Sequence, residues 1–392
     1  MNLILFDDPD IRLNLFPFTL TRPVSAIRVG ILTIAEKWET CLHAKAFFKT
    51  EAYLQAKFPI ASTSDNLLLN GAICPDETLV ATVMALPDGY FLVKDTLLVA
   101  ARNPGAEMTS KNTIQYLQEF TVIDRPWKIF RENGAQLRID FKRITAERKS
   151  EAINDNHTRV YGEDNIFLEE GVYIRAAILN AENGPIYLGK NSIVQEGAII
   201  RGAFALCEKS QINMGAKIRG DVTIGPDSKV GGEVSNSVIF GYSNKSHDGY
   251  LGNSVLGEWC NIGADTNTSN LKNSYDPIKI WNHAAQDFVQ TELQFCGLMM
   301  GDHSKCSINT MFNTATVVDV CSNIFGAGFP RRYVPSFSWG GASGFTTHQL
   351  EKALYTSSRV MARRNVIMDD VDREILFHIF KLTAPDRVWE KN

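Results

Sequence analysis

Residues 188–230 read LGKNSIVQEG AIIRGAFALC EKSQINMGAK IRGDVTIGPD SKV, and a branched aliphatic residue recurs at every sixth position of this stretch. The aliphatics are Leu188, Val194, Ile200, Leu206, Ile212, Ile218, Ile224 and Val230. Neither the 3.6-residue period of a helix nor the two-residue alternation of a strand gives a strict step of six. A six-residue repeat is typical of a parallel β-helix, a three-sided prism whose hexapeptides point their aliphatics inward. We therefore predict a left-handed parallel β-helix of hexapeptide repeats. The alternative, a β-sandwich with regular turns, does not explain the strict spacing.

Composition excludes several classes of protein. The formal net charge of -4, with both signs mixed along the chain, predicts no basic surface for nucleic acid. No apolar run approaches membrane-spanning length. The start of the chain has no basic residues before Asp7 and Asp8, so it does not resemble a secretory signal. The seven scattered cysteines contain no CxxC pair, which favours reduced thiols and a cytoplasmic location.

We expect three parts in a chain of 392 residues. Residues 1–150 alternate short apolar runs with amphipathic segments, as in an α/β domain; one expected helix, 128–132, should stop at Asn133-Gly134. Residues 151–340 form the β-helix, with loops leaving it at 236–249 and 270–282 and a further loop at 330–344. Residues 341–392 form two helices that cap the prism, roughly 347–363 and 370–382, with Asp369 or Asp370 at the start of the second.

A prism filled with aliphatics has no internal pocket, so its chemistry must lie on outer faces, in loops or between neighbouring prisms. The expected loop at 236–249 places Lys245 and His247 close to Tyr250. An imidazole can accept a proton near neutral pH, for example from a sugar amine that attacks a thioester. Backbone amides or polar side chains would then stabilise the oxyanion. The alternative interpretation is a solvated surface histidine.

A longer motif runs from residue 245 to residue 271. Its characteristic residues are His247, Tyr250, Leu251, Gly252, Asn261, Ile262, Gly263, Ala264, Asn270 and Leu271. This motif resembles the bifunctional UDP-N-acetylglucosamine pyrophosphorylase / glucosamine-1-phosphate N-acetyltransferase (GlmU) family, and more closely a divergent Bacteroidetes branch of it.

The resemblance implies a set of roles for these residues. It makes His247 the general base of acetyl transfer. Contacts to the amino-sugar phosphate or the acetyl donor would come from Tyr250, Asn261 and Asn270, with Lys245, Lys272 and Lys279 as further substrate-binding candidates. Ser235 or Asn236 stands where the family has a phosphate-binding lysine, so the acceptor sugar stays open.

The N-terminal part resembles the sugar-phosphate nucleotidyltransferase half of the family, through Leu20-Thr21-Arg22-Pro23 and the helix expected after Gly30. Arg22, Arg28 and Asn70 are the candidates for contact with nucleotide phosphate, and the alternative for the two arginines is a surface salt bridge. Two features differ from the family. Residues 7–18 contain no glycine for a phosphate-binding loop, and Ala72 stands where the family has a magnesium-binding aspartate. Possible substitutes are Asp7, Asp8, Asp76 and Asp140, so Mg²⁺ binding and pyrophosphorylase activity stay open.

Two further groups suggest a site for the acetyl donor. Residues 302–306 either shape a turn or line a donor cleft beside His247, which makes His303 and Lys305 candidates for contact with coenzyme A. Arg331 and Arg332, expected just after the last coil, could meet its phosphates. A zinc site would need closely spaced histidines, and no close pair exists, so no metal is assigned.

These observations predict a transferase of a sugar-nucleotide pathway. The β-helix would transfer acetyl from acetyl-CoA to an amino-sugar 1-phosphate, and the first domain could join a sugar 1-phosphate to a nucleoside triphosphate. In one alternative only one of the two parts is active. In another, the protein binds nucleotide sugars without catalysis. We expect a homotrimer, because prisms pack side by side in this family, and no nucleic-acid or membrane partner.

Overall fold

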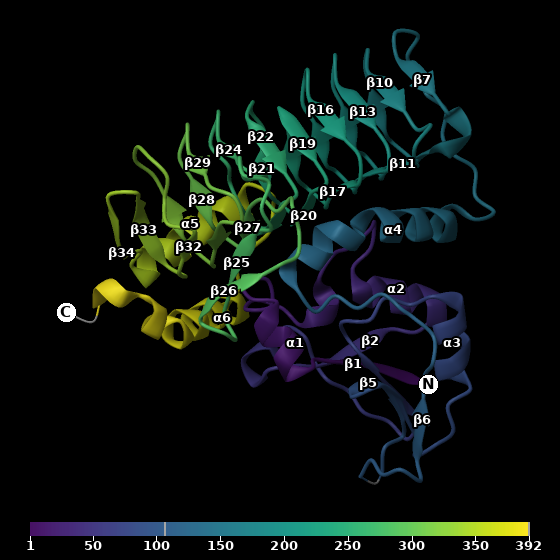
Figure 1. The fold of residues 1–392 in the computed structure, drawn as a ribbon. Coiled ribbons are helices and arrows are strands. Elements are labelled where there is room, and N and C mark those ends of the chain that lie inside the picture. The colour runs from purple at the N-terminus through teal and green to yellow at the C-terminus, as the bar shows by residue number, and fades with distance from the viewer. Residues whose placement is uncertain (106, 391–392) are drawn as a thin grey trace.

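The N-terminal part folds around a mixed six-stranded sheet with the strand order β2-β1-β3-β5-β4-β6. The computed structural model describes residues 1–105 and 107–390 and is drawn in Figure 1. β1 pairs in parallel with β2 and β3, whereas β5 is antiparallel to β3 and β4. The strands are β1 (Asn2–Phe6), β2 (Ala46–Lys49), β3 (Asn66–Asn70), β4 (Phe91–Lys94), β5 (Leu97–Arg102) and β6 (Thr113–Gln115); the helices are α1 (Pro9–Asn14), α2 (Ile34–Leu42), α3 (Glu77–Met84) and α4 (Pro126–Thr145).

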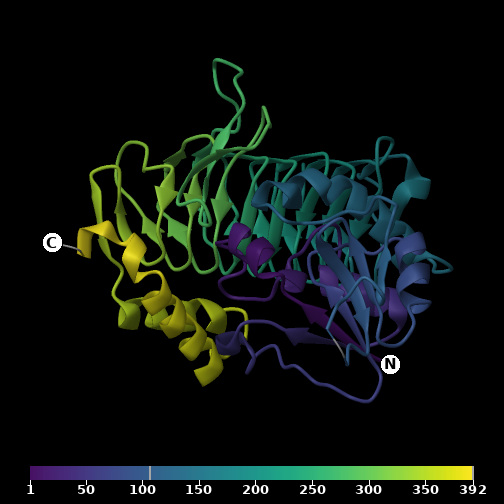
Figure 2. The same cartoon turned by 60° about the horizontal axis from the view of Figure 1, so that its bottom comes forward.

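A three-sided parallel β-helix follows, which confirms the predicted fold class (Figures 1 and 2). Each of the eight ladder aliphatics is at most 1% exposed, since all point into the prism. The covered face, which the N-terminal sheet domain and α4 pack against, contains β8 (Ile166–Leu168), β11 (Ile186–Leu188), β14 (Phe204–Leu206), β17 (Val222–Ile224), β20 (Val238–Gly241), β23 (Val255–Glu258), β27 (Met299–Met300), β30 (Val317–Val318) and β32 (Tyr333–Val334).

The other two faces are open to solvent along much of their length. The first open face contains β9 (Tyr173–Ile174), β12 (Ile193–Val194), β15 (Gln211–Ile212), β18 (Lys229–Val230), β21 (Asn244–Lys245), β28 (Lys305–Cys306), β31 (Asn323–Ile324), β33 (Ser338–Gly341) and β34 (Gly344–Thr347). The second open face contains β7 (Arg159–Tyr161), β10 (Ile178–Asn180), β13 (Ile199–Arg201), β16 (Lys217–Arg219), β19 (Glu233–Ser235) and β22 (Tyr250–Gly252), continued by β24 (Asn267–Thr268) and β29 (Met311–Phe312).

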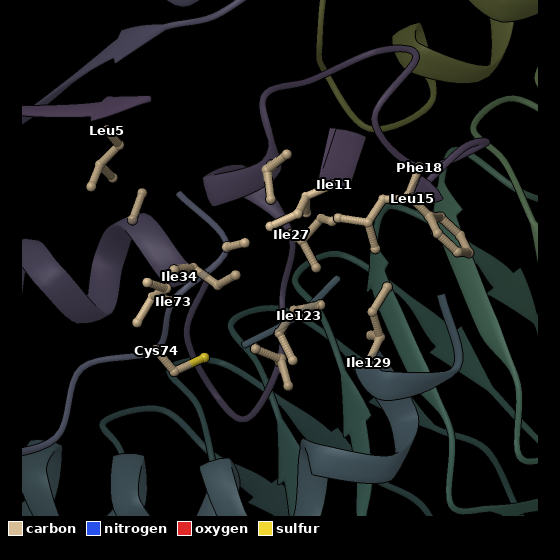
Figure 3. Packing of buried hydrophobic residues seen from close by; sticks show 14 of the residues in the cluster. Leu5, Ile11, Leu15, Phe18, Ile27, Ile34, Ile73, Cys74, Ile123 and Ile129 are labelled. Atoms are coloured by element: carbon tan, nitrogen blue, oxygen red, sulfur yellow. The ribbon is translucent and has the colours of Figure 1, made fainter. Parts of the chain in front are cut away.

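The covered face shares a hydrophobic core with the N-terminal domain. Outward-facing Phe240 on β20 and Val255 on β23 belong to the same buried cluster as Leu15, Phe18 and Ile129 of the first domain. Figure 3 shows Phe18 and Leu15 lying against the prism strands, with Ile129 approaching from α4. Strand β17 of this face is therefore buried on both sides, whereas β13 and β16 expose their outer residues.

Polar contacts tie the same junction together. The guanidinium of Arg22 is buried and pairs with the carboxylates of Asp302 and, at 3.1 Å, Glu258, both on the prism. The buried amide of Asn133 on α4 donates to the carbonyl of Asp221 at 2.8 Å. A buried guanidinium needs such partners, because an unpaired charge there would be strongly destabilising.

Helix α4 corrects one expectation from the sequence. We predicted that it stops at Asn133-Gly134, but it continues to Thr145. Gly134 is not a helix terminator here; a Cβ at this position would lie 2.3 Å from Cγ of Asp221. The glycine allows close approach of the helix to the prism, and the sequence alone does not distinguish this use from a stop signal.

Two predicted loops are also wrong. Residues 236–249 do not leave the prism, since they form β20 and β21 within it. This coil is shorter than the usual 18 residues: Phe204 pairs with Val222, but Thr223 pairs with Val238 only fifteen residues later. Residues 330–344 likewise contain β32 and β33, so the coils continue beyond Arg332.

The excursion after Asn270 and the helical tail agree with the sequence. The excursion contains the antiparallel hairpin of β25 (Lys279–Asn282) and β26 (Asp287–Gln290). The tail helices are α5 (Leu350–Ala362) and α6 (Asp370–Leu382), and the Asp369 carboxylate caps α6. They pack near the end of the prism and against the first domain (Figure 2). No helix in the described part of the chain has the length and apolar character needed to span a bilayer.

Candidate functional site

His247 lies on a turn, residues 246–249, at the edge where the two open faces meet, and its side chain is exposed. Every carbonyl of this turn accepts a hydrogen bond. The Ser246 carbonyl accepts one from the Asn213 amide (2.8 Å), that of Asp248 from the Asp265 backbone N–H (3.1 Å), and that of Gly249 from the Glu233 backbone N–H (3.2 Å). The His247 carbonyl accepts one from Nζ of Lys245 (2.6 Å). An exposed imidazole therefore stands on a firmly held backbone.

Lys245 does not reach a substrate, contrary to our expectation. It is in register with Val230 of the inward ladder and is 2% exposed. Burial lowers the pKa of its ammonium to about 8, because the charged form loses its hydration. Its place in the prism interior excludes direct contact with a ligand on the outer faces.

Tyr250 and Asn270, twenty residues apart, are brought together on the second open face. The Tyr250 hydroxyl lies 3.0 Å from Nδ2 of Asn270 and 3.1 Å from Oγ of Ser235. The same Asn270 amide donates to Oδ1 of Asn253 at 2.7 Å. The packing of Tyr250 requires a glycine at position 252, because a Cβ there would lie 2.2 Å from the Tyr250 hydroxyl oxygen. The phenol therefore lies along its own strand, over Gly252.

Asn261 lies on the first open face, apart from the Tyr250 group. It bridges in parallel to Asn244 and to Lys305, and its Oδ1 accepts from Asn244 at 3.3 Å. The two asparagines that the family resemblance singles out thus flank the His247 edge from different faces.

Lys272 and Lys279 belong to the excursion after Asn270. Nζ of Lys272 donates to the Pro277 carbonyl at 2.8 Å, within its own loop. Lys279 is exposed at the start of β25. No described contact joins either side chain to the Tyr250 group. Their role as substrate-binding residues therefore stays a prediction.

His303 and Lys305 do not line a cleft beside His247. His303 lies at the edge between the covered face and the first open face, where it stacks on Trp259 with centroids 6.2 Å apart. Burial holds the pKa of its imidazole well below the usual value. Nζ of Lys305 donates to the His303 carbonyl at 2.7 Å. The strand of the first open face separates this edge from that of His247.

Arg331 and Arg332 lie between the last coils rather than after them. Arg332 donates to the Lys279 carbonyl at 3.1 Å and its guanidinium covers the ring of Phe288. Arg331 is exposed and lines a cavity of about 570 Å³ with Trp281 and Tyr333. Only Arg331 is thus free to meet an anionic ligand.

The nucleotide-binding residues expected in the first domain have structural contacts. Arg22 is paired with Asp302 and Glu258, and the partly buried Arg28 donates to the carbonyls of Ile31 and Phe240 and pairs with Glu36 at 3.6 Å. Asn70 is fully buried; its amide donates to the Leu98 carbonyl at 3.0 Å and its Oδ1 accepts from the Ala72 N–H at 3.0 Å. These contacts give all three side chains structural partners, and their role in binding phosphate stays a prediction.

The acids considered for magnesium are engaged in the same way. Asp140 is fully buried against Lys37 and accepts from the N–H groups of Ile31 and Leu32. Asp7 is paired with Arg12, and the remaining two cap helices: Asp8 caps α1 and Asp76 caps α3. Within residues 1–105 and 107–390, no group of three or more histidines, cysteines and acids could hold a metal ion. The residues present do not fit a magnesium site.

Sequence reasoning missed several partners. Asn253 and Asn213 hold Asn270 and the 246–249 turn, and Glu258 with Asp302 holds Arg22. For Asn253, its place directly after Tyr-Leu-Gly was a usable signal. The contacts of Asn213, Glu258 and Asp302 depend on how the coils align with one another, which the sequence alone does not show.

Comparison with known proteins supports the expected resemblance to the GlmU family. Residues 3–149 match the family model described as sugar nucleotidyl transferase. The bifunctional protein GlmU of Methanococcus aeolicus is 27% identical over 139 residues, which are 35% of this chain and 29% of that protein. The GlmU of Trichodesmium erythraeum is 36% identical over 76 residues, 19% of this chain and 15% of that protein. The matches thus span less than a third of the length of these curated relatives.

A solved UDP-N-acetylglucosamine acyltransferase from Campylobacter jejuni aligns with 60% of this chain and 84% of its own, at 12% identity and a TM-score of 0.26. A score this low carries no argument about this chain.

Proposed function

We propose that this chain is a transferase of a sugar-nucleotide pathway, and that its β-helix transfers acetyl from acetyl-CoA to the amine of an amino-sugar 1-phosphate. The observation that carries the proposal is the His247 edge. An exposed imidazole, on a turn whose four carbonyls all accept hydrogen bonds, is flanked by the Tyr250–Asn270 group on one face and by Asn261 on the other. The similarity to GlmU proteins supports the same assignment.

The chemistry assigned to His247 is general base catalysis. As the amine nitrogen attacks the thioester carbonyl, a C–N bond forms and the imidazole takes the amine proton. The tetrahedral oxyanion then collapses, the C–S bond breaks, and the proton goes to the departing thiolate of coenzyme A. Polar side chains around the edge orient the sugar; hydrogen-bond donors there would stabilise the oxyanion.

The test is an assay of free-thiol release from acetyl-CoA with a panel of amino-sugar 1-phosphates. His247→Ala should lower the rate of thiol release by at least about a hundredfold and leave the fold intact. Tyr250→Phe should mainly raise KM, because it removes a hydroxyl of the positioning group. Acetyl transfer by the alanine variant at the wild-type rate would contradict the assigned mechanism.

Nucleotidyl transfer by the first domain is a second candidate, favoured by the family match over residues 3–149. The pairing of Arg22 with Asp302 and Glu258 counts against it, as does the lack of a fitting acid group within residues 1–105 and 107–390. Release of pyrophosphate from nucleoside triphosphates and sugar 1-phosphates, with and without Mg²⁺, separates an active from an inert first domain. If no pyrophosphate is released, acetyl transfer by the β-helix would be the single activity proposed for the protein. The lack of both activities would favour the alternative of a non-enzymatic nucleotide-sugar-binding protein.

The proposal includes a homotrimer, because a second prism beside the His247 edge would turn an exposed edge into a cleft. Light scattering at working concentration tests it, and a monomer would count against the site as drawn. A cytoplasmic location is likewise proposed, in keeping with seven free thiols.

A further inference from the structure

Among the residues that the structure describes, the inward ladder of the prism holds one ammonium group, that of Lys245. Along the first open face the inward positions are Val194, Ile212, Val230 and then Lys245, before Ile262 and Cys306 continue the column. Val230 and Ile212 are fully buried, and Lys245 is 2% exposed. An ammonium at such a position costs free energy that an aliphatic residue would not.

The ammonium has one protein partner among the hydrogen bonds of the described residues, the carbonyl of His247 two residues later, at 2.6 Å. The acidic side chains that favour its charged form are Asp248 on the turn and Asp265 on the next coil. The bond thus connects the interior directly to the turn that carries the imidazole.

Two kinds of contact restrain the 246–249 turn: close packing and hydrogen bonds from neighbouring coils, and the bond from Lys245. A Cβ at Gly231 would lie 2.3 Å from the Ser246 carbonyl oxygen, and one at Gly232 would lie 2.8 Å from that of His247. Asn213, Asp265 and Glu233 hold the carbonyls on either side of His247. The carbonyl of His247 is held from inside the prism, by Lys245 alone.

We propose that Lys245 is a positioning residue for the His247 base: its ammonium fixes the His247 carbonyl and thereby the direction in which the imidazole leaves the edge. This inference rests on the proposed acetyl transfer and adds a residue that contacts no substrate. It also gives a reason why a polar group stands at a ladder position, since a valine there would fill the space but leave the carbonyl unpaired.

The test uses Lys245→Met in the full chain, because methionine keeps most of the volume and removes the donor. The matched control is Lys229→Met, which removes an exposed lysine from the neighbouring coil. We expect kcat for thiol release to fall about ten- to a hundredfold in Lys245→Met, since small misplacements of a catalytic group have effects of this size. The melting temperature should be unchanged or higher, and Lys229→Met should match the wild type in both respects.

Hydrogen–deuterium exchange of the peptide covering 246–252 gives a readout that does not need activity. It should be about tenfold faster in Lys245→Met, since a charged hydrogen bond is lost, and unchanged in Lys229→Met. Faster exchange in Lys245→Met, together with a wild-type protein that releases no thiol, would overturn the proposed function and keep this inference. Unchanged exchange and kcat in an active protein would overturn the inference and keep the function. A lower melting temperature with proportionate loss of active protein would show a merely structural lysine, which also overturns it.

Discussion

The coils before and after Val230 are built on the same three faces but serve different ends. From Leu188 to Val230 each coil has 18 residues, every ladder position is aliphatic, and the outward residues of the two open faces are mostly solvated. In the next two coils the spacing falls to 15 and 17 residues, since Thr223 pairs with Val238 and Val238 with Val255. An inward position becomes Lys245, and the turn beyond it carries His247. The regular coils supply rigidity, and a departure of one to three residues from their length is enough to create a candidate site.

Removal of the His247 imidazole should give the largest loss of activity and tests whether the short coils carry the site. We expect His247→Ala to lower kcat for thiol release by about 10²- to 10⁴-fold, the usual contribution of a general base. Because the side chain is exposed, the melting temperature should not change. A circular dichroism melt beside the thiol assay checks both halves of the statement.

The regular coils should respond in the opposite way. Ile212→Ala leaves a cavity in the fully buried ladder and should lower the free energy of unfolding by about 2–5 kcal/mol. The kcat of the protein that remains folded should be close to the wild-type value. Urea unfolding gives the first quantity, and thiol release corrected for the folded fraction gives the second. A large loss of kcat would show that the ladder and the site are not separable.

The buried lysine gives the comparison a pH dependence. The pKa of Lys245 is about 8 in the folded protein and the ordinary value is 10.5, so the folded state binds fewer protons between these values. The stability of the wild type relative to Lys245→Met should therefore rise between about pH 8 and pH 10.5, by on the order of 3 kcal/mol. Below about pH 8 the difference should be constant, with the full cost of the charged group present. Denaturant unfolding of both proteins at pH 7, 9 and 10.5 measures it, and parallel curves would contradict the interior position of the ammonium.

Gly252 should give the smallest effect on catalysis. In Gly252→Ala the new methyl would lie 2.2 Å from the Tyr250 hydroxyl oxygen and 2.8 Å from Nδ2 of Asn270, so the phenol must swing away from Asn270. We expect KM for the amino-sugar phosphate to rise about tenfold, the value of one hydrogen bond of about 1.4 kcal/mol. As a comparison, alanine at Gly215 meets no atom within 4 Å but has a φ of +67°, and should affect stability without changing KM.

The sequence predicts the regular part of the fold well, because each inward aliphatic is decided by its own position in a six-residue step. It predicts the short coils poorly. Lys245 at an inward position and the missing residues between Thr223 and Val238 look like the end of the prism when only periodicity is available. The stop predicted at Gly134 fails for a related reason, since the residue that requires glycine, Asp221, lies 87 residues later.

The candidate site follows the same division. His247, Tyr250 and Asn270 could be named from a motif, and the contact between Tyr250 and Asn270 agrees with the grouping that the motif implies. The contacts of Lys245 and Arg22 could not be foreseen, because one depends on coil register and the other joins residues 280 positions apart. An arginine in a familiar motif therefore says little about phosphate until its carboxylate partners are known.

The core shared between the covered face and the first domain has a consequence for the way this protein can be taken apart. Phe240 and Val255 of the prism are buried in the same cluster as Leu15 and Phe18 of the first domain. Separate expression of either half would leave a large apolar surface in water, which favours aggregation. Cleavage in the segment 147–157, between α4 and the first coil, would cut the chain without releasing either fragment. The two halves should therefore melt in a single calorimetric transition, as one cooperative folding unit.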